Sequence, residues 1–197
     1  MSQKSDCLSW IAWIEGDECA FKDLYAQYAD ILFSFGLRYT PDRDLVKDAI
    51  HDLFVDLHKY RKSLSLQVNV KGYLFSSLKR KIVSVLKKHQ QEAGFEHSDL
   101  SFYISYGHED SIILKESERE LRGRLQRELN LLPDRQREVL YLRFHSELSY
   151  EEIAVFMNIS VATCRTLVYR ALKQLRESIG SRASFSYVLL LLFKKKS

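Results

Sequence analysis

The chain has 197 residues, of which 46% are hydrophobic and 28% are charged, and its formal net charge is +4. This composition is typical of folded globular proteins and excludes an intrinsically disordered chain. No apolar run reaches the roughly 20 residues that span a bilayer, and the first residues lack the basic-then-apolar order of a signal peptide. We therefore expect a cytoplasmic protein.

The residue types that shape the backbone are sparse. Seven glycines and two prolines predict a mostly helical chain with short connections. Three cysteines at irregular spacing, without a CxxC pair, predict reduced thiols and neither a disulfide framework nor a zinc site. The expected fold is all-α, with two small helical domains joined by a flexible linker.

The first domain is expected at residues 8–90, where apolar residues recur with helical spacing. Pro41 separates the first two helices, and the segment 63–69 is too short and mixed for a helix, which predicts a loop. The three apolar stripes are Phe21, Leu24, Tyr28, Leu32 and Phe35; Leu45, Val46, Ala49, Ile50, Leu53, Phe54 and Leu57; and Leu74, Leu78, Ile82, Val85 and Leu86.

Charge is distributed in blocks along the chain. Between Leu57 and Gln91 there is no acidic residue, whereas nine lysines and arginines occur there. Residues 91–111 are acidic and show no helical period, which predicts a linker. A second domain is expected at residues 112–182, and residues 183–197 form an apolar and basic tail. Two alternatives remain open for this tail: it packs against the second domain, or it docks to a partner protein or a membrane surface.

The second domain is predicted to begin with a long charged helix. Its apolar positions are Leu114, Leu121, Leu125, Leu129 and Leu132. Another helix is expected to start with Pro133 in its first turn, where the missing N–H group costs nothing.

A helix-turn-helix is predicted next. Ser149 and Glu152 have the spacing of a capping box, so a helix should run from Tyr150 to about Met157. Asn158 can adopt a left-handed conformation in the turn, and Ser160 can cap the following helix. Two helices joined by so short a turn are typical of DNA-binding proteins.

The second helix of this pair has two different faces. Its apolar arc should be buried and contains Val161, Cys164, Leu167, Val168, Ala171, Leu172 and Leu175. The opposite arc has no acidic residue before Glu177 and contains Ala162, Thr163, Arg165, Thr166, Tyr169, Arg170 and Lys173. Arginine and threonine suit base edges in a major groove, and further basic residues suit phosphates. A helical hairpin with a solvated basic face is the alternative.

Four motifs together resemble one family. They are GDECAFKDLYAQYADILF, DAIHDLFVDLHKYR, LPDRQREVLYLRF and LSYEEIA…RALKQLR, and the resemblance covers roughly residues 11–176. In this order they resemble the extracytoplasmic-function (ECF) branch of the sigma-70 family, the small bacterial promoter-specificity factors. The sequence departs from the usual pattern at His51, where the family has Gln, and at Arg80, where it has Asn.

The resemblance implies partners and site residues. It implies binding to core RNA polymerase, to promoter DNA, and to an anti-sigma factor in the cytosol or at the membrane. The polymerase-binding residues would be Asp48, His51, Asp52, Phe54, Val55 and Asp56. The residues at the minus-ten element would be Asn69, Lys71, Tyr73, Lys79, Arg80, Lys81, Lys87 and Lys88. The outward arc of the second helix would read the minus-thirty-five element.

Two other classes of protein are alternatives to this family. A stand-alone helix-turn-helix regulator, with an N-terminal dimerisation or sensing module, would not need the second basic block. An enzyme is not expected, because there is no Gly-rich phosphate loop, no metal-spaced His/Cys cluster and no nucleophile–base pair. The sequence therefore predicts no catalytic residue, no cofactor, no metal and no small-molecule substrate.

Overall fold

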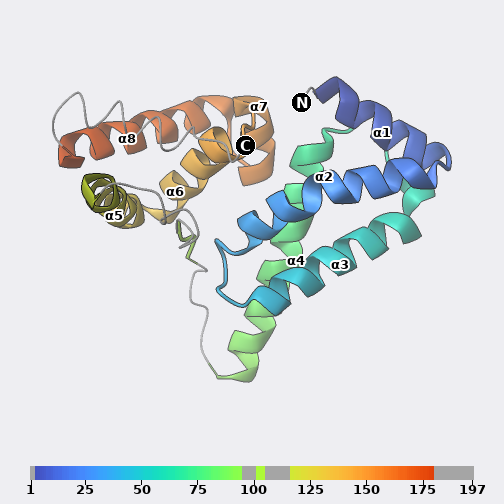
Figure 1. The fold of residues 1–197 in the computed structure, drawn as a ribbon, viewed down its shortest axis with the longest axis horizontal. Helices are drawn as coiled ribbons and strands as arrows, with labels where there is room; N and C mark the ends of the chain where they lie inside the picture. Colours follow the sequence, from blue (N-terminus) through green and yellow to red (C-terminus); the bar gives the residue numbers. More distant parts are fainter. Residues whose placement is uncertain (1–2, 95–100, 105–115, 180–197) are drawn as a thin grey trace. The chain divides into compact units, whose positions relative to one another are not determined.

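The structure is a computed structural model that describes residues 3–94, 101–104 and 116–179 (Figure 1). Every regular element in these ranges is helical, which confirms the predicted all-α class. The chain divides into two compact units, residues 1–100 and residues 101–197. Within the described residues, no helix is both long and apolar enough to cross a membrane.

In the part of the first unit that the structure describes, the chain forms four α-helices and a short 3₁₀ turn. Asp17, Asp42 and Asn69 precede three of the helices, and each side chain accepts hydrogen bonds from the free backbone N–H groups of the first turn. The elements are α1 (Gln3–Glu15), α2 (Glu18–Gly36), α3 (Arg43–Lys59), the turn η1 (Arg61–Ser63) and α4 (Val70–Glu92).

The core of this unit forms where α2 and α3 lie side by side and α4 crosses both (Figure 1). Most predicted stripe residues are buried there, because their spacing of three and four places them on one helix face. Three half-buried residues, Phe21, Leu45 and Leu86, border the core, and Val85 is exposed.

Helix α1 was not predicted, although it completes this core. Trp10 and Trp13 are fully buried, with their ring centroids 5.1 Å apart. The indole Nε1 of Trp10 donates to the carbonyl of Ser65 at 3.0 Å, which ties α1 to the loop before α4. Asp6 accepts hydrogen bonds from Tyr28 and Gln27 of α2, both at 2.6 Å.

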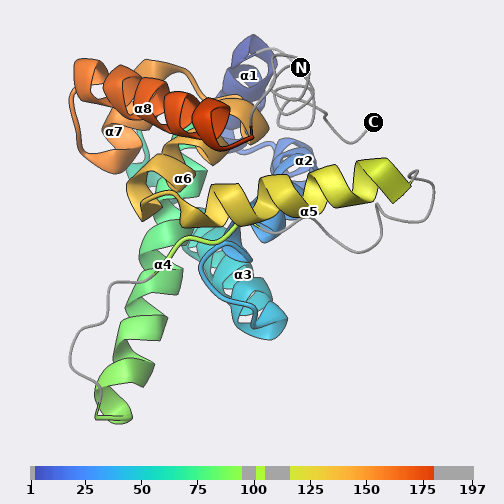
Figure 2. The same cartoon turned by 90° about the vertical axis from the view of Figure 1, so that its left-hand side faces the viewer.

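The described residues of the second unit form four α-helices and one π-helical turn. Helix α6 links α5 to the α7–α8 pair and packs against α8 (Figure 2). The predicted core residues Leu125, Leu129 and Leu132 are buried, while Leu114 lies outside the described residues. The elements are α5 (Glu116–Leu131), α6 (Asp134–Leu140), the π turn η3 (Tyr141–His145), α7 (Tyr150–Met157) and α8 (Val161–Ile179).

Pro133 was predicted in the first turn of a helix, but it lies one position before that helix begins. It is the N-cap of α6 and not a residue of its first turn, with an extended ψ of 144°. Proline accepts this position because its ring fixes φ near the observed value of −54°.

Residues 101–104 pack within the second unit, although their sequence was assigned to the linker. Phe102 is 2% exposed and Ile104 is 4% exposed. We call residues 101–104 the docked segment. Helix α4 also extends to Glu92, two residues into the predicted linker. The remaining linker residues 95–100 and 105–111 lie outside the described residues, as does the tail at 183–197.

Candidate nucleic-acid and polymerase interfaces

The helix-turn-helix has the predicted local geometry. Ser149 Oγ accepts from the backbone N–H of Glu152 at 3.1 Å, and the Glu152 carboxylate accepts from the N–H of Ser149 in return. Asn158 is left-handed, with φ at 52°. Ser160 Oγ accepts from the N–H of Thr163 at 3.0 Å and so caps α8. The capping box, the turn and the bounds of α7 are therefore confirmed.

The two faces of α8 differ as its sequence predicts. Cys164, Val168, Ala171 and Leu175 are buried, whereas Val161, Leu167 and Leu172 of the same predicted arc are half-buried. All seven residues proposed to meet DNA are exposed, including Tyr169 at 67%. We call these seven residues the α8 reading face: Ala162, Thr163, Arg165, Thr166, Tyr169, Arg170 and Lys173.

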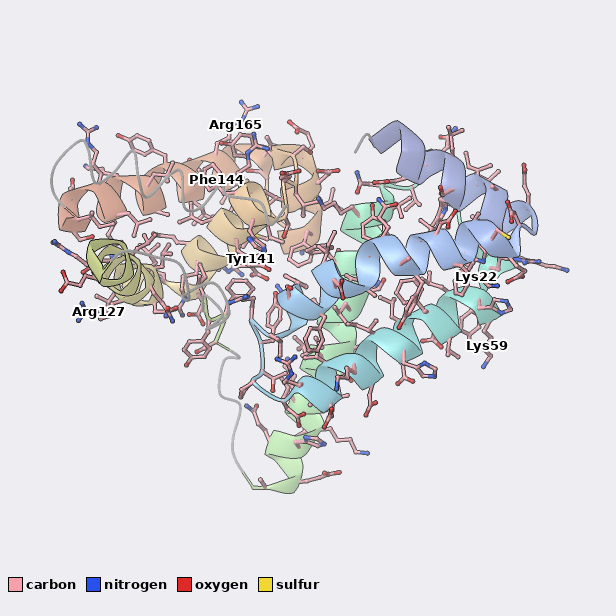
Figure 3. The ribbon with its side chains drawn as sticks, viewed as in Figure 1. Lys22, Lys59, Arg127, Tyr141, Phe144 and Arg165 are labelled. Carbon is pink, nitrogen blue, oxygen red and sulfur yellow. The ribbon has the colours of Figure 1, made fainter. Side chains whose placement is uncertain are left out.

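Neighbouring side chains restrict Arg165 (labelled in Figure 3). Its guanidinium lies 5.5 Å from the centre of the Tyr150 ring, and the guanidinium of Arg143 lies 4.8 Å from the same ring. Arg143 is itself fixed, because it donates to the carbonyl of Leu148 at 2.8 Å. Glu151 forms a 4.0 Å ion pair with Arg165. Sequence reasoning missed Tyr150 and Arg143, since their link to Arg165 exists only after folding.

The predicted basic surface on α4 is uneven. Arg80, Lys87 and Lys88 are exposed, and Asn69 is exposed while capping α4 through Gly72 N–H at 2.7 Å. Four further predicted residues are half-buried: Lys71, Tyr73, Lys79 and Lys81. The Tyr73 ring lies edge-on to Trp10 at 5.7 Å. Phe75, the aromatic residue two positions after Tyr73, is fully buried in the core and cannot stack on a base.

One ion pair joins the two surfaces predicted on the first unit. Lys81 Nζ of α4 lies 2.5 Å from Asp56 Oδ2 of α3. Lys81 was assigned to DNA and Asp56 to polymerase, but in this structure each charge is directed at the other. The pair therefore links α3 to α4.

The predicted polymerase-binding helix α3 has an exposed polar face beside an apolar groove. Asp48, His51 and Asp52 are exposed, and Val55 is 48% exposed. Phe54, by contrast, is only 5% exposed and belongs to the core, as does Leu57. A groove of about 410 Å³ opens at Val55, and α2 supplies one of its walls. Its lining residues are Phe21, Tyr25, His51, Phe54, Val55, His58 and Lys59, of which Lys59 is labelled in Figure 3.

Comparison with known proteins agrees with this arrangement. Residues 122–175 match the family described as Sigma-70, region 4. The ECF RNA polymerase sigma-E factor of Escherichia coli K12 is 30% identical over 180 residues, covering 85% of this chain and 88% of the relative. The chain belongs to the ECF sigma factors.

Other relatives of this ECF sigma factor span both of its units. The ECF RNA polymerase sigma factor SigM of Bacillus subtilis is 27% identical over 158 residues, covering 78% of this chain and 91% of the relative. A solved structure of the sigma factor RpoE of Bartonella quintana, in complex with the anti-sigma factor NepR, has the same fold. Its TM-score is 0.56 at 24% identity, over 80% of this chain and 94% of that one.

A second solved structure also has this fold. CnrH, in complex with the cytosolic domain of CnrY, covers 94% of this chain and 97% of its own length, with a TM-score of 0.56 at 19% identity. Among the described residues of this ECF sigma factor, no group of three or more His, Cys, Asp or Glu side chains could hold a metal ion.

Proposed function

We propose that this ECF sigma factor binds core RNA polymerase and directs transcription from a specific set of promoters through two DNA-binding surfaces. The first unit, whose domain the sequence predicts at residues 8–90, binds polymerase through α3 and the minus-ten element through α4. The second unit reads the minus-thirty-five element through α8. The docked segment is assigned to the second unit, and the acidic residues of 91–111 connect the two.

The α8 reading face is the observation that carries this proposal. Its seven residues are exposed on a helix that is capped by Ser160 and preceded by a left-handed Asn158. The early residues of such a helix meet base edges when it enters a major groove. Arg165 suits guanine, and the small side chain of Ala162 allows a close approach. Arg170 and Lys173, further along the helix, suit phosphates.

The polymerase surface is proposed to combine charge with apolar area. Asp48 and Asp52 supply negative charge on α3, and Val55 and Tyr25 expose apolar surface at the groove beside them. Charged groups of this kind set orientation and association rate, while apolar anchors at the centre of an interface supply much of the affinity. Phe54 contributes from beneath by supporting the groove.

An anti-sigma factor is the proposed regulatory partner. Both similar solved structures are complexes, one with an anti-sigma factor and one with the cytosolic domain of CnrY. Since polymerase and promoter DNA are the proposed targets, we place the protein in the cytoplasm.

The stand-alone regulator is the weaker alternative. The similarity to sigma-E covers 85% of this chain, so it includes the first unit and not the helix-turn-helix alone. An unrelated dimerisation or sensing module in the first unit would not be expected to show this similarity to sigma-E.

The decisive experiment adds the purified protein to bacterial core polymerase and sequences the transcripts that start. We expect one shared promoter motif upstream of the start sites. Asp52→Lys and Val55→Glu should each lower polymerase binding at least tenfold, because both positions are exposed and their replacement leaves the core intact. Lys22→Gln, an exposed change on α2, is the matched control. Absence of transcripts, or unchanged binding by both variants, would contradict the assignment.

A further inference from the structure

One ion pair of the first unit joins two surfaces that are proposed to bind different partners. Lys81 Nζ of α4 lies 2.5 Å from Asp56 Oδ2 of α3, close enough for a charge-assisted hydrogen bond. The Lys81 side chain is 27% exposed and the Asp56 side chain is 48% exposed. Because both keep contact with solvent, opening the pair would not leave a buried charge unpaired. Pairs of this kind contribute little to stability, so this one can exchange partners while the unit stays folded.

Further carboxylates of α3 lie near Lys81. Asp48, Asp52 and Asp56 are four residues apart and therefore lie on one face of the helix; we call them the α3 aspartate row. Asp48 and Asp52 line a groove of about 580 Å³ between α3 and α4, and Lys81 lines the same groove from α4. These carboxylates offset the positive charge of Lys81 and repel a phosphate that approaches it. In this state Lys81 is therefore a poor ligand for DNA.

The position of Lys81 on α4 nevertheless suits a DNA contact. Lys88 lies two turns after Lys81, about 10 Å along the axis of the same helix face, and it is exposed. A strand whose phosphates contact Lys88 therefore passes close to Lys81. Release of the Lys81 ammonium group from Asp56 would add one phosphate contact to this face.

We propose that the Asp56–Lys81 pair couples polymerase binding to DNA binding in the first unit. Without polymerase the pair withholds Lys81 from DNA, and a positively charged polymerase surface that engages the α3 aspartate row releases it. The inference rests on the proposed function, in which α3 binds polymerase and α4 binds the minus-ten element. Each partner then replaces one half of the pair, a polymerase cation at Asp56 and a DNA phosphate at Lys81. Such coupling is reciprocal, so DNA raises the affinity for polymerase by the same factor.

A purely structural role for the pair predicts the opposite result. If Asp56 only held α3 against α4, Asp56→Asn would loosen the first unit and weaken DNA binding. If the pair withholds Lys81, the same substitution frees the ammonium group and strengthens DNA binding. The sign of the effect in the protein without polymerase therefore separates the two roles.

The first measurement uses the full-length protein alone with a labelled single-stranded oligonucleotide of mixed sequence, because contacts of lysine with phosphate do not depend on sequence. The variants are Asp56→Asn, Lys81→Gln and the double variant with both changes. Asp30→Asn, an exposed change on α2 with the same effect on net charge, is the matched control. Circular dichroism checks that each variant keeps its helices.

We expect Asp56→Asn to bind the oligonucleotide roughly three- to fivefold more tightly than wild type at about 0.1 M salt, because one further phosphate contact adds about 0.7 to the slope of log K against log salt. In the Lys81→Gln background the same change should alter affinity by less than about 1.5-fold, since no lysine is left to release. If Asp56→Asn does not keep its helices, Asp52→Asn decides. It removes a carboxylate from the groove at Lys81 and should also tighten binding.

The second measurement adds core polymerase and compares its affinity for the protein with and without a saturating amount of the oligonucleotide. Loss of Asp56 weakens polymerase binding in both conditions and cancels in the ratio of the two affinities, as do contacts of the oligonucleotide with core itself. The ratio should be about threefold smaller in Asp56→Asn than in wild type, and it should be unchanged in Asp30→Asn.

Three results would each overturn the inference alone. The first is an Asp56→Asn protein that binds the oligonucleotide no more tightly than wild type. The second is a tightening that persists in the Lys81→Gln background, because the effect would then come from net charge. The third is an equal affinity ratio for wild type and Asp56→Asn in the presence of core. If the wild-type protein does not bind core polymerase, the proposed function fails, and the inference fails with it.

Discussion

Individual side chains fix the direction of Arg165 on the α8 reading face. The Tyr150 ring has one guanidinium at 4.8 Å, from Arg143, and one at 5.5 Å, from Arg165. Cations over an aromatic face are attracted by its quadrupole, and Arg143 is already held by the Leu148 carbonyl. The Glu151 pair contributes less, because both of its side chains are more than half exposed.

Replacing Tyr150 should therefore reduce selectivity at the base pair that Arg165 reads. Tyr150→Leu removes the ring, and an exposed cation–π contact is worth about 0.5–1 kcal/mol, which corresponds to roughly a two- to fivefold loss of discrimination. Tyr150→Phe keeps the ring face and serves as the control. The measurement is the ratio of transcript yields from two promoters that differ at this base pair. Equal ratios for wild type and Tyr150→Leu would show that the ring does not orient Arg165.

At the scale of helices, Gly36 determines how closely three elements approach. A Cβ atom at Gly36 would lie 2.5 Å from Val46 Cγ1 of α3 and 3.1 Å from Ile82 Cδ1 of α4. Valine is stiff at χ1 and cannot turn away easily. Gly123 in α5 is the opposite case, because a Cβ atom there would meet nothing within 4 Å.

Two glycine-to-alanine substitutions should therefore have opposite effects on stability. Gly36→Ala overpacks the core of the first unit and should destabilise it by about 1–3 kcal/mol. Gly123→Ala should stabilise α5 by roughly 0.5–1 kcal/mol, since glycine is a poor helix former. Chemical unfolding followed by circular dichroism can measure both changes. A neutral Gly36→Ala would mean that α2, α3 and α4 are packed less closely than described.

At the scale of the whole molecule, basic surfaces on both units are proposed to contact one promoter. Exposed cations of α4 and of the α8 reading face would each displace counterions from DNA phosphates. Acidic side chains are frequent on α3 and in the linker sequence, and two others, Glu92 of α4 and Glu177 of α8, pair with Lys88 and Lys173 near the ends of those helices. This separation of charge favours DNA on two surfaces and polymerase on a third.

Promoter binding by the holoenzyme should consequently weaken steeply with salt. If six to ten phosphates are contacted, affinity should fall roughly 10³- to 10⁵-fold between about 50 and 200 mM salt. The double variant Lys87→Gln with Lys88→Gln should lower the slope of log K against log salt by about two. Lys22→Gln, on α2, should leave the slope unchanged. The measurement is equilibrium binding to a labelled promoter, and equal slopes for all three proteins would remove α4 from the DNA interface.

The helices that the sequence predicts correctly are those marked by residues close together in the chain. Helical spacing of Leu24, Leu53 and Leu78 marks faces that are buried, and the Ser149–Glu152 pair marks the start of α7. These features depend on residues three or four positions apart, so the chain carries them before any tertiary contact forms. The exposed residues of α8 follow from the same periodicity.

Other features depend on partners distant in the chain. The sequence did not predict helix α1, because its two tryptophans pack against residues distant in the chain. Trp10, for example, donates a hydrogen bond to Ser65, which is 55 residues away. Asp56 and Lys81 form an ion pair with each other, although the sequence assigned Asp56 to polymerase binding and Lys81 to DNA binding. The docked segment reads as linker because Asn130, its hydrogen-bonding partner, lies 26 residues downstream.

The sequence by itself determined that this protein is helical, where the helix-turn-helix lies, and that the chain resembles ECF sigma factors. Only the tertiary structure decided that Phe54 supports the groove from the core while Val55 faces outward, and that residues 101–104 belong to the second unit. The reason is that periodicity assigns a residue to a helix face, whereas burial and hydrogen bonding depend on what packs against that face.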